Sequence, residues 1–173
     1  MHKLPMLLAV LSITGCSTVQ TAESAAVSEV ASANLVRANG SAVGVATLSQ
    51  RSDGLWLNIA ADAPGRGTYG MHVHAVGRCD GPEFTTAGPH LNPAMKQHGR
   101  DNPMGAHSGD MPNVTANAAG RLVIETKLTG AMFAQVLDAD GASVVIHEKP
   151  DDYKTDPSGN SGKRLICGVF KSG

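Results

Sequence analysis

The chain has 173 residues, a formal net charge of −1 and only 3% aromatic residues. This length fits one domain of ordinary size. Nucleic-acid-binding proteins usually carry a strongly positive charge or stacking aromatics, so the composition argues against that class. The 20 glycines and the short β-branched segments between turn-like clusters favour an all-β sandwich or barrel.

The N-terminus is typical of an export signal. Met1-His2-Lys3 leads into the apolar run Leu4–Ile13, which is too short for a permanent membrane helix but suits the hydrophobic region of a signal. The chain then reaches Ile13-Thr14-Gly15-Cys16, which resembles the lipobox of bacterial lipoproteins, in which the cysteine is acylated. We therefore expect a lipoprotein-type signal peptide at 1–15 and a lipid on Cys16.

An ordinary secretory signal cut within residues 17–26, with Cys16 discarded, is the alternative. Either signal places the mature protein outside the cytoplasm, in the periplasm or cell envelope. Ser17 after Cys16 favours an outer-membrane anchor by the same resemblance, and this lipid would be the chain's contact with the membrane. Residues 16–32 have no aromatic residue and no clear strand pattern, so we expect a flexible tether before a domain at 33–173.

Eight strands are predicted in that domain, because short apolar and β-branched runs alternate with turn signals. Their ranges are 34–37, 42–49, 55–61, 69–76, 114–117, 121–127, 142–147 and 164–170. The expected turns include Asn39-Gly40, Asp53-Gly54 and Asn117–Gly120.

Two irregular stretches, 77–113 and 148–162, interrupt this pattern. The first has a length at which a loop in a compact domain is usually functional or disordered. The predicted fold class is therefore all-β, an eight-stranded Greek-key β-barrel or sandwich with two long functional loops.

Six histidines outside the signal lie in or beside those two loops. His72 and His74 stand two residues apart, and alternate residues of a strand point to the same face. The pair alone is compatible with two metal ligands or with two ordinary polar residues. The other four are His90, His98, His107 and His147. Together with a nearby carboxylate, Asp110, they favour a metal site.

Three imidazoles and a carboxylate are sufficient for a tetrahedral zinc site, so His90, His98, His107 and Asp110 form a candidate structural site. The remaining His72, His74 and His147 would leave a more open centre, and a set of imidazoles suits copper. Since imidazole has two nitrogens, His90 can bind zinc with one and copper with the other.

Five motifs resemble, in order, the successive motifs of copper/zinc superoxide dismutases. They are "GMHVHAVGRC", "AGPHLNP", "HSGDMPN", "HEKPDD" and "RLICGV", and the resemblance covers residues from about 34 to 170. It implies one copper ion and one zinc ion per subunit. Copper would be bound by His72, His74, His90 and His147, and zinc by His90, His98, His107 and Asp110.

The resemblance also assigns roles beyond the ligands. Arg164 matches the family's active-site arginine, which holds an anion and stays charged at any relevant pH. Asp151 matches the carboxylate that ties a copper-binding histidine to a zinc-binding one, and such partners fix ring orientation. Cys79 would pair with Cys167, and a disulfide is the usual state of a cysteine pair in an oxidising compartment.

The implied function is dismutation of superoxide to dioxygen and hydrogen peroxide, in protection of the cell envelope. His90 would be catalytic as well as bridging, because its copper-side nitrogen releases the reduced metal and takes up a proton. Lys149, Lys154 and Lys163 are candidates for attracting the anion, although three aspartates share their loop. Subunit contacts vary in the family, so the resemblance is compatible with a homodimer and with a monomer.

The alternative function is a non-catalytic copper/zinc-binding or metal-delivery envelope protein of the same fold. Proteins of that kind usually lack ligands or the arginine, whereas this chain has all of them. A zinc hydrolase would need a general base beside the open site, and the first motif offers no glutamate. A purely structural envelope lipoprotein leaves the clustered histidines unexplained.

Overall fold

The computed structural model describes residues 29–173, so the expected signal peptide, Cys16 and most of the expected tether lie outside the described residues. The strands are β1 (Glu29–Arg37), β2 (Ala42–Arg51), β3 (Gly54–Asp62), β4 (Thr68–Tyr69), β5 (Met71–His74), β6 (Val114–Thr115), β7 (Arg121–Leu128), β8 (Ser143–His147), β9 (Arg164–Val169) and β10 (Lys171–Ser172). The helical elements of this part are a 3-10 turn at Thr85–Ala87 and the short α1 (Phe133–Val136). In the described range, no helix has the length and apolarity needed to cross a membrane.

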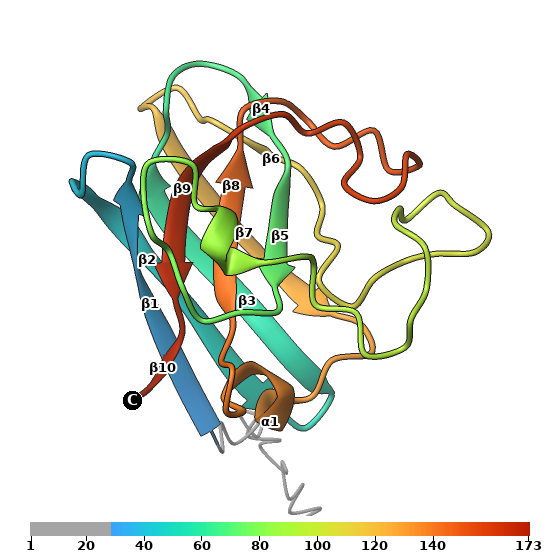
Figure 1. Cartoon of the computed structure of the whole chain (residues 1–173). Helices are drawn as coiled ribbons and strands as arrows, with labels where there is room; N and C mark the ends of the chain where they lie inside the picture. Colours follow the sequence, from blue (N-terminus) through green and yellow to red (C-terminus); the bar gives the residue numbers. More distant parts are fainter. Residues whose placement is uncertain (1–28) are drawn as a thin grey trace, which may run out of the picture.

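Eight of these strands form one curled antiparallel sheet (Figure 1). Its order is β5-β8-β9-β1-β2-β3-β7, and β10 pairs with β1 beyond the end of β9. Hairpins link β1, β2 and β3 in sequence, and the late strand β9 pairs with β1. The order β9-β1-β2-β3 is that of a Greek key. This confirms the predicted all-β Greek-key class, in the form of a half-barrel.

The two edges of the sheet are joined at one end by the small sheet β4-β6. β4 leads directly into β5, and β6 leads into β7 through the predicted turn at 117–120, where Gly120 N donates to Asn117 O at 2.9 Å. Pairing of β4 with β6 thus ties the first edge strand to the last.

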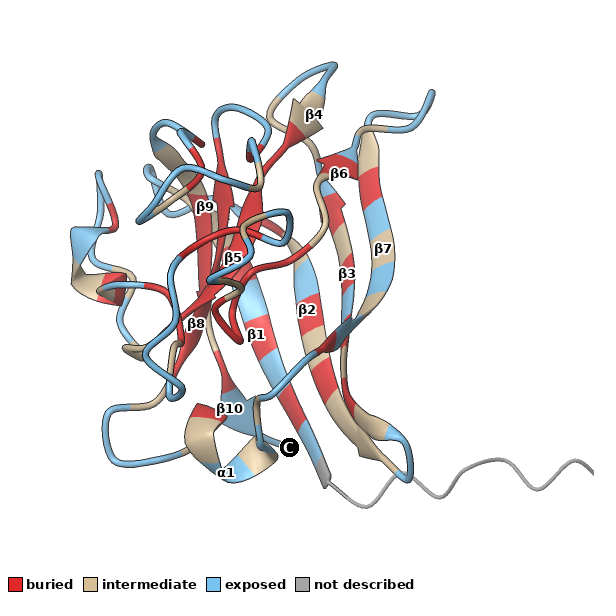
Figure 2. Ribbon diagram, turned by 90° about the vertical axis from the view of Figure 1, so that its right-hand side faces the viewer, coloured by how far each residue is buried: buried red, intermediate tan, exposed pale blue. Residues whose placement is uncertain are grey.

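The core lies inside the curl, on one face of each strand. In β3 the buried residues Leu55, Leu57, Ile59 and Ala61 alternate with more exposed ones, which is the period of a half-buried strand. Figure 2 shows the same alternation of buried and exposed segments along β1, β2 and β7. Each buried leucine or isoleucine contributes about 1.5–3 kcal/mol to folding.

Two of the differences from the expected elements concern the chain start and the metal centre. β1 begins at Glu29 and pairs with β2 from that residue on, so the expected boundary at residue 33 falls within a strand. The predicted strand 69–76 is divided at Gly70, whose N–H donates to Lys149 O and whose carbonyl accepts the N–H of His147, both at 2.8 Å. A side chain at Gly70 would come within 2.8 Å of Ser161 Oγ, so the absence of one lets the second long loop pack against this point.

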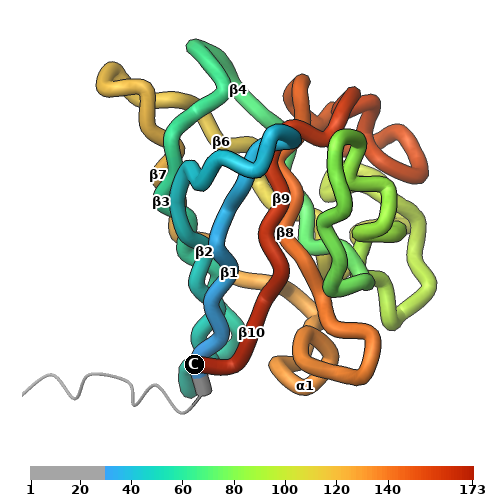
Figure 3. The backbone as a smooth tube through the Cα atoms, turned by 60° about the vertical axis from the view of Figure 1, so that its left-hand side comes forward, coloured from blue at the N-terminus to red at the C-terminus, as the bar shows by residue number. Residues whose placement is uncertain are grey.

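The two long loops, 77–113 and 148–162, gather on one side of the sheet beside β5, β8 and β9 (Figure 3). They cover the face of these strands that does not point into the core. For this reason β5 and β8 are buried on both faces over their whole length.

Candidate metal centre

β5 supplies two buried imidazoles. Met71 and Val73 point into the main core, so the alternate residues His72 and His74 point to the opposite face, under the loops. Both rings are 0% exposed. The two imidazoles therefore lie on the same side of β5, beneath the loops.

The first long loop pairs with the free edge of β5. Leu91 N donates to Val73 O at 2.8 Å and Val73 N donates to Gly109 O at 2.9 Å. These bonds place His90 opposite His74, and Asp110 opposite His72. Any side chain at Gly109 would overlap the carbonyl of Val73, so glycine is required for the loop to come this close.

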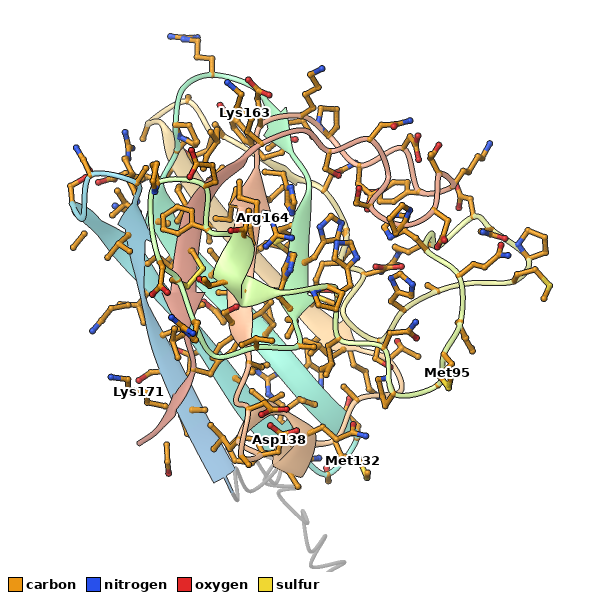
Figure 4. The ribbon with its side chains drawn as sticks, in the orientation of Figure 1. Met95, Met132, Asp138, Lys163, Arg164 and Lys171 are labelled. Carbon is orange, nitrogen blue, oxygen red and sulfur yellow. A yellow bond between two sulfur atoms is a disulfide. The ribbon has the colours of Figure 1, made fainter. Side chains whose placement is uncertain are left out.

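β8 and β9 supply a histidine and an arginine. His147 is the last residue of β8, and an irregularity in the register between Ile146 and His147 sets it opposite Arg164, the first residue of β9. Bulges of this kind re-aim side chains next to active sites. Arg164 is labelled in Figure 4, together with its neighbour Lys163.

The first cluster of ligand atoms consists of ring nitrogens. One nitrogen from each of its four histidines lies within 4.8 Å of the others; the residues are His72, His74, His90 and His147. Among the described residues, six buried side-chain nitrogens have no hydrogen-bond partner, and four of them are His72 Nδ1, His74 Nε2, His90 Nε2 and His147 Nε2. A buried unpartnered polar atom costs about 1–3 kcal/mol, so four of them facing one another fit a bound cation.

The second cluster surrounds Asp110 Oδ1. This oxygen lies 2.9 Å from His90 Nδ1, 3.0 Å from His98 Nδ1 and 3.3 Å from His107 Nδ1, and the Nδ1 atoms of His90 and His107 are 3.4 Å apart. Four ligands at the usual zinc bond lengths in a tetrahedron would be about 3.3 Å apart. The distances from Asp110 Oδ1 to the three imidazoles, and the distance between His90 and His107, are close to this separation, so this donor set suits zinc.

His72 also lies close to this second cluster, within 4.8 Å of ligand atoms from His90, His98 and Asp110. Its ring stacks on that of His90, with the centroids 3.9 Å apart. Its Nε2, however, is engaged by Asp151 Oδ2 at 2.7 Å. The free Nδ1 of His72 is therefore the atom available to the first cluster.

Two carboxylates orient the rings. Asp110 Oδ2 accepts the backbone N–H groups of Gly99 at 2.9 Å and His107 at 3.0 Å, which leaves Oδ1 directed at the three imidazoles. Asp151 joins the two clusters, because its Oδ2 accepts from His72 Nε2 and its Oδ1 accepts from His98 Nε2 at 3.0 Å. Asp151 thus lies between a histidine of each cluster.

Burial sets the protonation of the first cluster. Desolvation lowers the pKa of His72, and it lowers the pKa of His74 well below its ordinary value. Desolvation also lowers the pKa of His90 to about 4 and that of His147 to about 3. These rings are therefore neutral at pH 7 and have lone pairs for a metal.

In the second cluster, the nearby carboxylates together have a larger effect on the pKa of His98 than burial has. Burial lowers the pKa of His98, but the close carboxylates of Asp110 and Asp151 outweigh this effect and raise the pKa to about 9. Burial acts to raise the pKa of each carboxylate, and the hydrogen bonds from His90 and His98 to Asp110 hold its pKa well below its ordinary value. The metal-free cluster thus holds a proton that a cation would replace.

A cavity of about 520 Å³ leads from the surface to the two clusters. Its lining includes His90, His147, Arg164, Lys96 and Asp156. The guanidinium of Arg164 is held by two carbonyls, with Nη1 donating to Phe84 O at 2.8 Å and Nη2 to Gly88 O at 2.9 Å. A small anion in this cavity therefore meets a fixed cation beside the first cluster.

The expected disulfide is present between Cys79 and Cys167, with the Cα atoms 5.8 Å apart. It fastens the start of the first loop to β9.

All of the sequence-predicted ligand candidates lie together in the two clusters. Three further residues contribute through a carbonyl or through contacts between loops. Gly88 and Asn113 lie within the motifs "AGPHLNP" and "HSGDMPN", but neither residue has a role predicted from the sequence, and Asp156 lies outside all five motifs.

Asn113 shows what such a contact does. Its side-chain amide donates to Asp151 O at 2.9 Å and accepts from Asp151 N at 2.8 Å, so both of its polar atoms hold the backbone of one residue. The carboxylate of Asp151 is thereby fixed between the two clusters.

Comparison with known proteins agrees with this geometry. The family described as copper/zinc superoxide dismutase (SODC) matches residues 42–170. The "Superoxide dismutase [Cu-Zn] 1" of Aquifex aeolicus is 38% identical over 145 residues, which is 80% of this chain and 86% of the relative. The "Superoxide dismutase [Cu-Zn]" of Caulobacter vibrioides is 38% identical over 140 residues, 77% of this chain and 80% of the relative. The "Superoxide dismutase-like protein YojM" of Bacillus subtilis is 41% identical over 144 residues, 79% and 73% of the two chains.

Solved structures of similar fold come from the same family. A "SOD-like protein from Bacillus subtilis" matches 80% of this chain and 96% of its own, with a TM-score of 0.76 and 38% identity. The "Cu/Zn superoxide dismutase from Brucella abortus" matches 83% of this chain and all of its own, with a TM-score of 0.68 and 26% identity. The chain therefore belongs to the copper/zinc superoxide dismutase family, as an enzyme that acts on superoxide with copper and zinc as cofactors.

Proposed function

We propose that copper is held by His72, His74, His90 and His147, that zinc is held by His90, His98, His107 and Asp110, and that His90 bridges the two ions. The observation that carries this assignment is the position of the His90 ring. Its Nδ1 lies 2.9 Å from Asp110 Oδ1 in the second cluster, and its Nε2 is buried without a partner in the first. Each nitrogen of one ring thus faces a different set of donors.

The protein's residues then have distinct tasks in dismutation. When bound, copper supplies the one-electron redox change and zinc supplies a fixed charge. Arg164 binds the superoxide anion in the cavity and keeps its charge there. His90 Nε2 takes up a proton when it is free of the metal and returns it toward the substrate, while Nδ1 keeps the ring in place. His74 Nδ1 donates to Gly88 O at 2.8 Å, which leaves its Nε2 as the metal-binding nitrogen.

A spectroscopic titration tests the ligand assignment. Copper(II) is added to the metal-free protein before and after one equivalent of zinc, and the visible absorption of copper is recorded. A shared His90 predicts that zinc shifts the copper band and that His107→Ala abolishes the shift while copper still binds. A copper band unaffected by zinc in the wild type would exclude the bridge.

The second candidate function is metal binding without turnover, and two relatives motivate it. One is named only "Superoxide dismutase-like protein", and a solved form of a SOD-like protein from the same species carries a tyrosine and a proline replaced by histidine. This chain has all six histidines of the two clusters and the arginine, which supports catalysis. Metal binding with no catalytic loss of superoxide would favour the alternative.

We also propose that the enzyme works in the periplasm or cell envelope, where it protects against superoxide. Residues 1–15 would be the signal peptide, residues 16–32 would form most of the tether, and a lipid on Cys16 would anchor the protein to the outer membrane. The lipobox-like sequence supports this. The Cys79–Cys167 disulfide supports it as well, because such bonds persist in oxidising compartments. Mass spectrometry of the mature N-terminus tests it, since an acylated Cys16 and a cleavage within 17–26 differ in mass.

The family resemblance is compatible with a homodimer and with a monomer. Gel filtration distinguishes the two.

A further inference from the structure

The second long loop, 148–162, packs against the later half of the first long loop, 77–113. Figures 1 and 3 both show the two loops side by side. Backbone bonds join them, for example from Asp101 N to Tyr153 O at 3.0 Å. The contact lies at the second cluster, beside His98 and His107.

Asp156 touches both. Its Oδ1 accepts the backbone N–H of His98 at 2.5 Å, and the same oxygen lies 3.9 Å from His107 Nε2. The other ring nitrogen of His107, Nδ1, faces Asp110. One carboxylate oxygen thus fixes the backbone of one histidine and faces the outer nitrogen of another.

Gly159 makes the second contact. Its φ of 63° favours glycine, and a side chain there would overlap the carboxylate of Asp151 and come within 2.7 Å of His98 Nε2. The backbone of Gly159 therefore lies directly on the Asp151–His98 hydrogen bond and excludes other groups from it.

Hydrogen bonds hold this turn in shape. The carboxylate of Asp152 accepts Lys154 N at 2.9 Å, Thr155 N at 2.8 Å and the side-chain amide of Asn160 at 2.9 Å. Gly159 N donates to Thr155 O at 2.7 Å. Asp156 and Gly159 are therefore presented by an ordered turn.

We propose that the turn 156–159 is a clamp that positions His98 and His107 for zinc, with Asp156 as its polar contact and Gly159 as its steric one. The inference rests on the zinc ligand set proposed above. Asp156 is then a positioning residue, since it acts through two ligands and takes no part as a ligand itself. Partners of metal-bound histidines commonly contribute 10- to 100-fold in metal affinity, so the loss of this contact is measurable.

The first test uses Asp156→Ala and Asp156→Asn in the enzyme loaded with copper and zinc. The rate of zinc transfer to a chromophoric chelator is measured, and the visible spectrum of cobalt(II) placed in the zinc site is recorded. We expect Asp156→Ala to release zinc about tenfold faster or more and to change the cobalt bands. Asp156→Asn retains an oxygen that accepts the N–H of His98, so its release rate should lie between those of Asp156→Ala and the wild type.

Asp101→Ala is the matched control. Asp101 is an exposed carboxylate three residues after His98, and its side chain makes no hydrogen bond or ion pair with the described residues. It removes the same charge from the same region, so its zinc release should equal that of the wild type. Equal release rates and spectra for Asp156→Ala and Asp101→Ala would overturn the clamp.

The second test compares Gly159→Ala with Gly120→Ala. Both glycines have positive φ, 63° and 72°, but a side chain at Gly120 would meet no atom within 4 Å. Gly159→Ala should perturb the cobalt spectrum and zinc retention, and Gly120→Ala should leave both unchanged. A wild-type protein that holds no zinc would overturn the ligand set itself, whereas wild-type zinc binding unaffected by either clamp substitution would overturn the clamp alone.

Discussion

Arg164 and His74 donate hydrogen bonds to the same carbonyl oxygen, that of Gly88, at 2.9 Å and 2.8 Å. The carbonyl lies in the segment that follows Cys79, and the disulfide to Cys167 fixes this segment to β9. The anion-binding cation and one ring of the first cluster are therefore positioned by one short piece of backbone. A change in that piece should affect both.

Removal of the disulfide tests this dependence. Cys79→Ser should lower the free energy of unfolding of the metal-free protein by about 4–5 kcal/mol, because the bond closes a loop with a sequence separation of 88 residues. It should also lower kcat/KM for superoxide, since Gly88 and Phe84 no longer hold the guanidinium. Urea unfolding and superoxide decay at matched metal content measure the two effects. Full activity in the unbridged protein would contradict this role of the segment.

Substitution of Arg164 should weaken substrate binding without loss of metal. We expect Arg164→Ala to lower kcat/KM by about tenfold or more, since loss of one preorganised donor costs on the order of 10²-fold in closed sites and this cavity is open to water. Arg164→Lys should recover part of the activity, because lysine keeps the charge but cannot make both carbonyl contacts in the same geometry. Metal analysis of each variant is the control, and a loss of copper from Arg164→Ala would show a different cause.

The lysine that guides superoxide is predicted to be Lys96. It lines the 520 Å³ cavity that leads to the two clusters, whereas the lysines that the sequence suggested, Lys149, Lys154 and Lys163, do not. Lys163 lines a separate pocket that also includes Arg164 but contains no histidine. Lys96→Gln should lower kcat/KM about two- to fivefold at low ionic strength, and salt should reduce the difference.

Lys154→Gln is the matched control for Lys96, because it removes the same charge from the neighbouring loop. It should have the activity and the salt dependence of the wild type. If it matched Lys96→Gln in both, the effect would be one of net charge and not of position in the cavity.

The metal-free protein should be most stable near pH 6.5–7. The lowered pKa values of His90 and His147, about 4 and about 3, mean that the unfolded chain binds more protons below pH 6.5, so acid destabilises the fold. At pH 5 this costs about 2 kcal/mol per histidine. The raised pKa of His98, about 9, stabilises the fold fully below pH 6.5, and this contribution is lost as the pH rises to 9.

Urea unfolding at pH 5, 7 and 9 measures this profile. Zinc should remove the alkaline decline, because the metal replaces the proton of His98. A metal-free protein whose stability rises steadily from pH 5 to pH 9 would contradict these assignments.

The histidines that gather in the two clusters could be predicted from strand geometry and from the family motifs. His72 and His74 share a face by strand alternation, and His147 ends a strand that is buried throughout. The disulfide partners and Asp151 followed from the family resemblance. These features depend on residue type and spacing, both of which the sequence contains.

The supporting contacts were not predictable, because they depend on the path of irregular loops. Gly88 acts through its carbonyl, which any residue has, and Asp156 gives no sequence signal that it turns toward His98. The division of the expected strand 69–76 at Gly70 arises from contacts with the second loop, far away in the sequence. The four-residue α1 carries no helical period long enough to detect.

The most direct test of the account is the decay of superoxide after a pulse, measured with catalytic amounts of the domain loaded with copper and zinc. The wild type should remove many equivalents of superoxide per copper, at a rate constant on the order of 10⁸–10⁹ M⁻¹s⁻¹, and His147→Ala should lose this activity while zinc binding persists. Consumption of no more than one equivalent of superoxide per bound copper would contradict the account and identify the protein as a metal carrier.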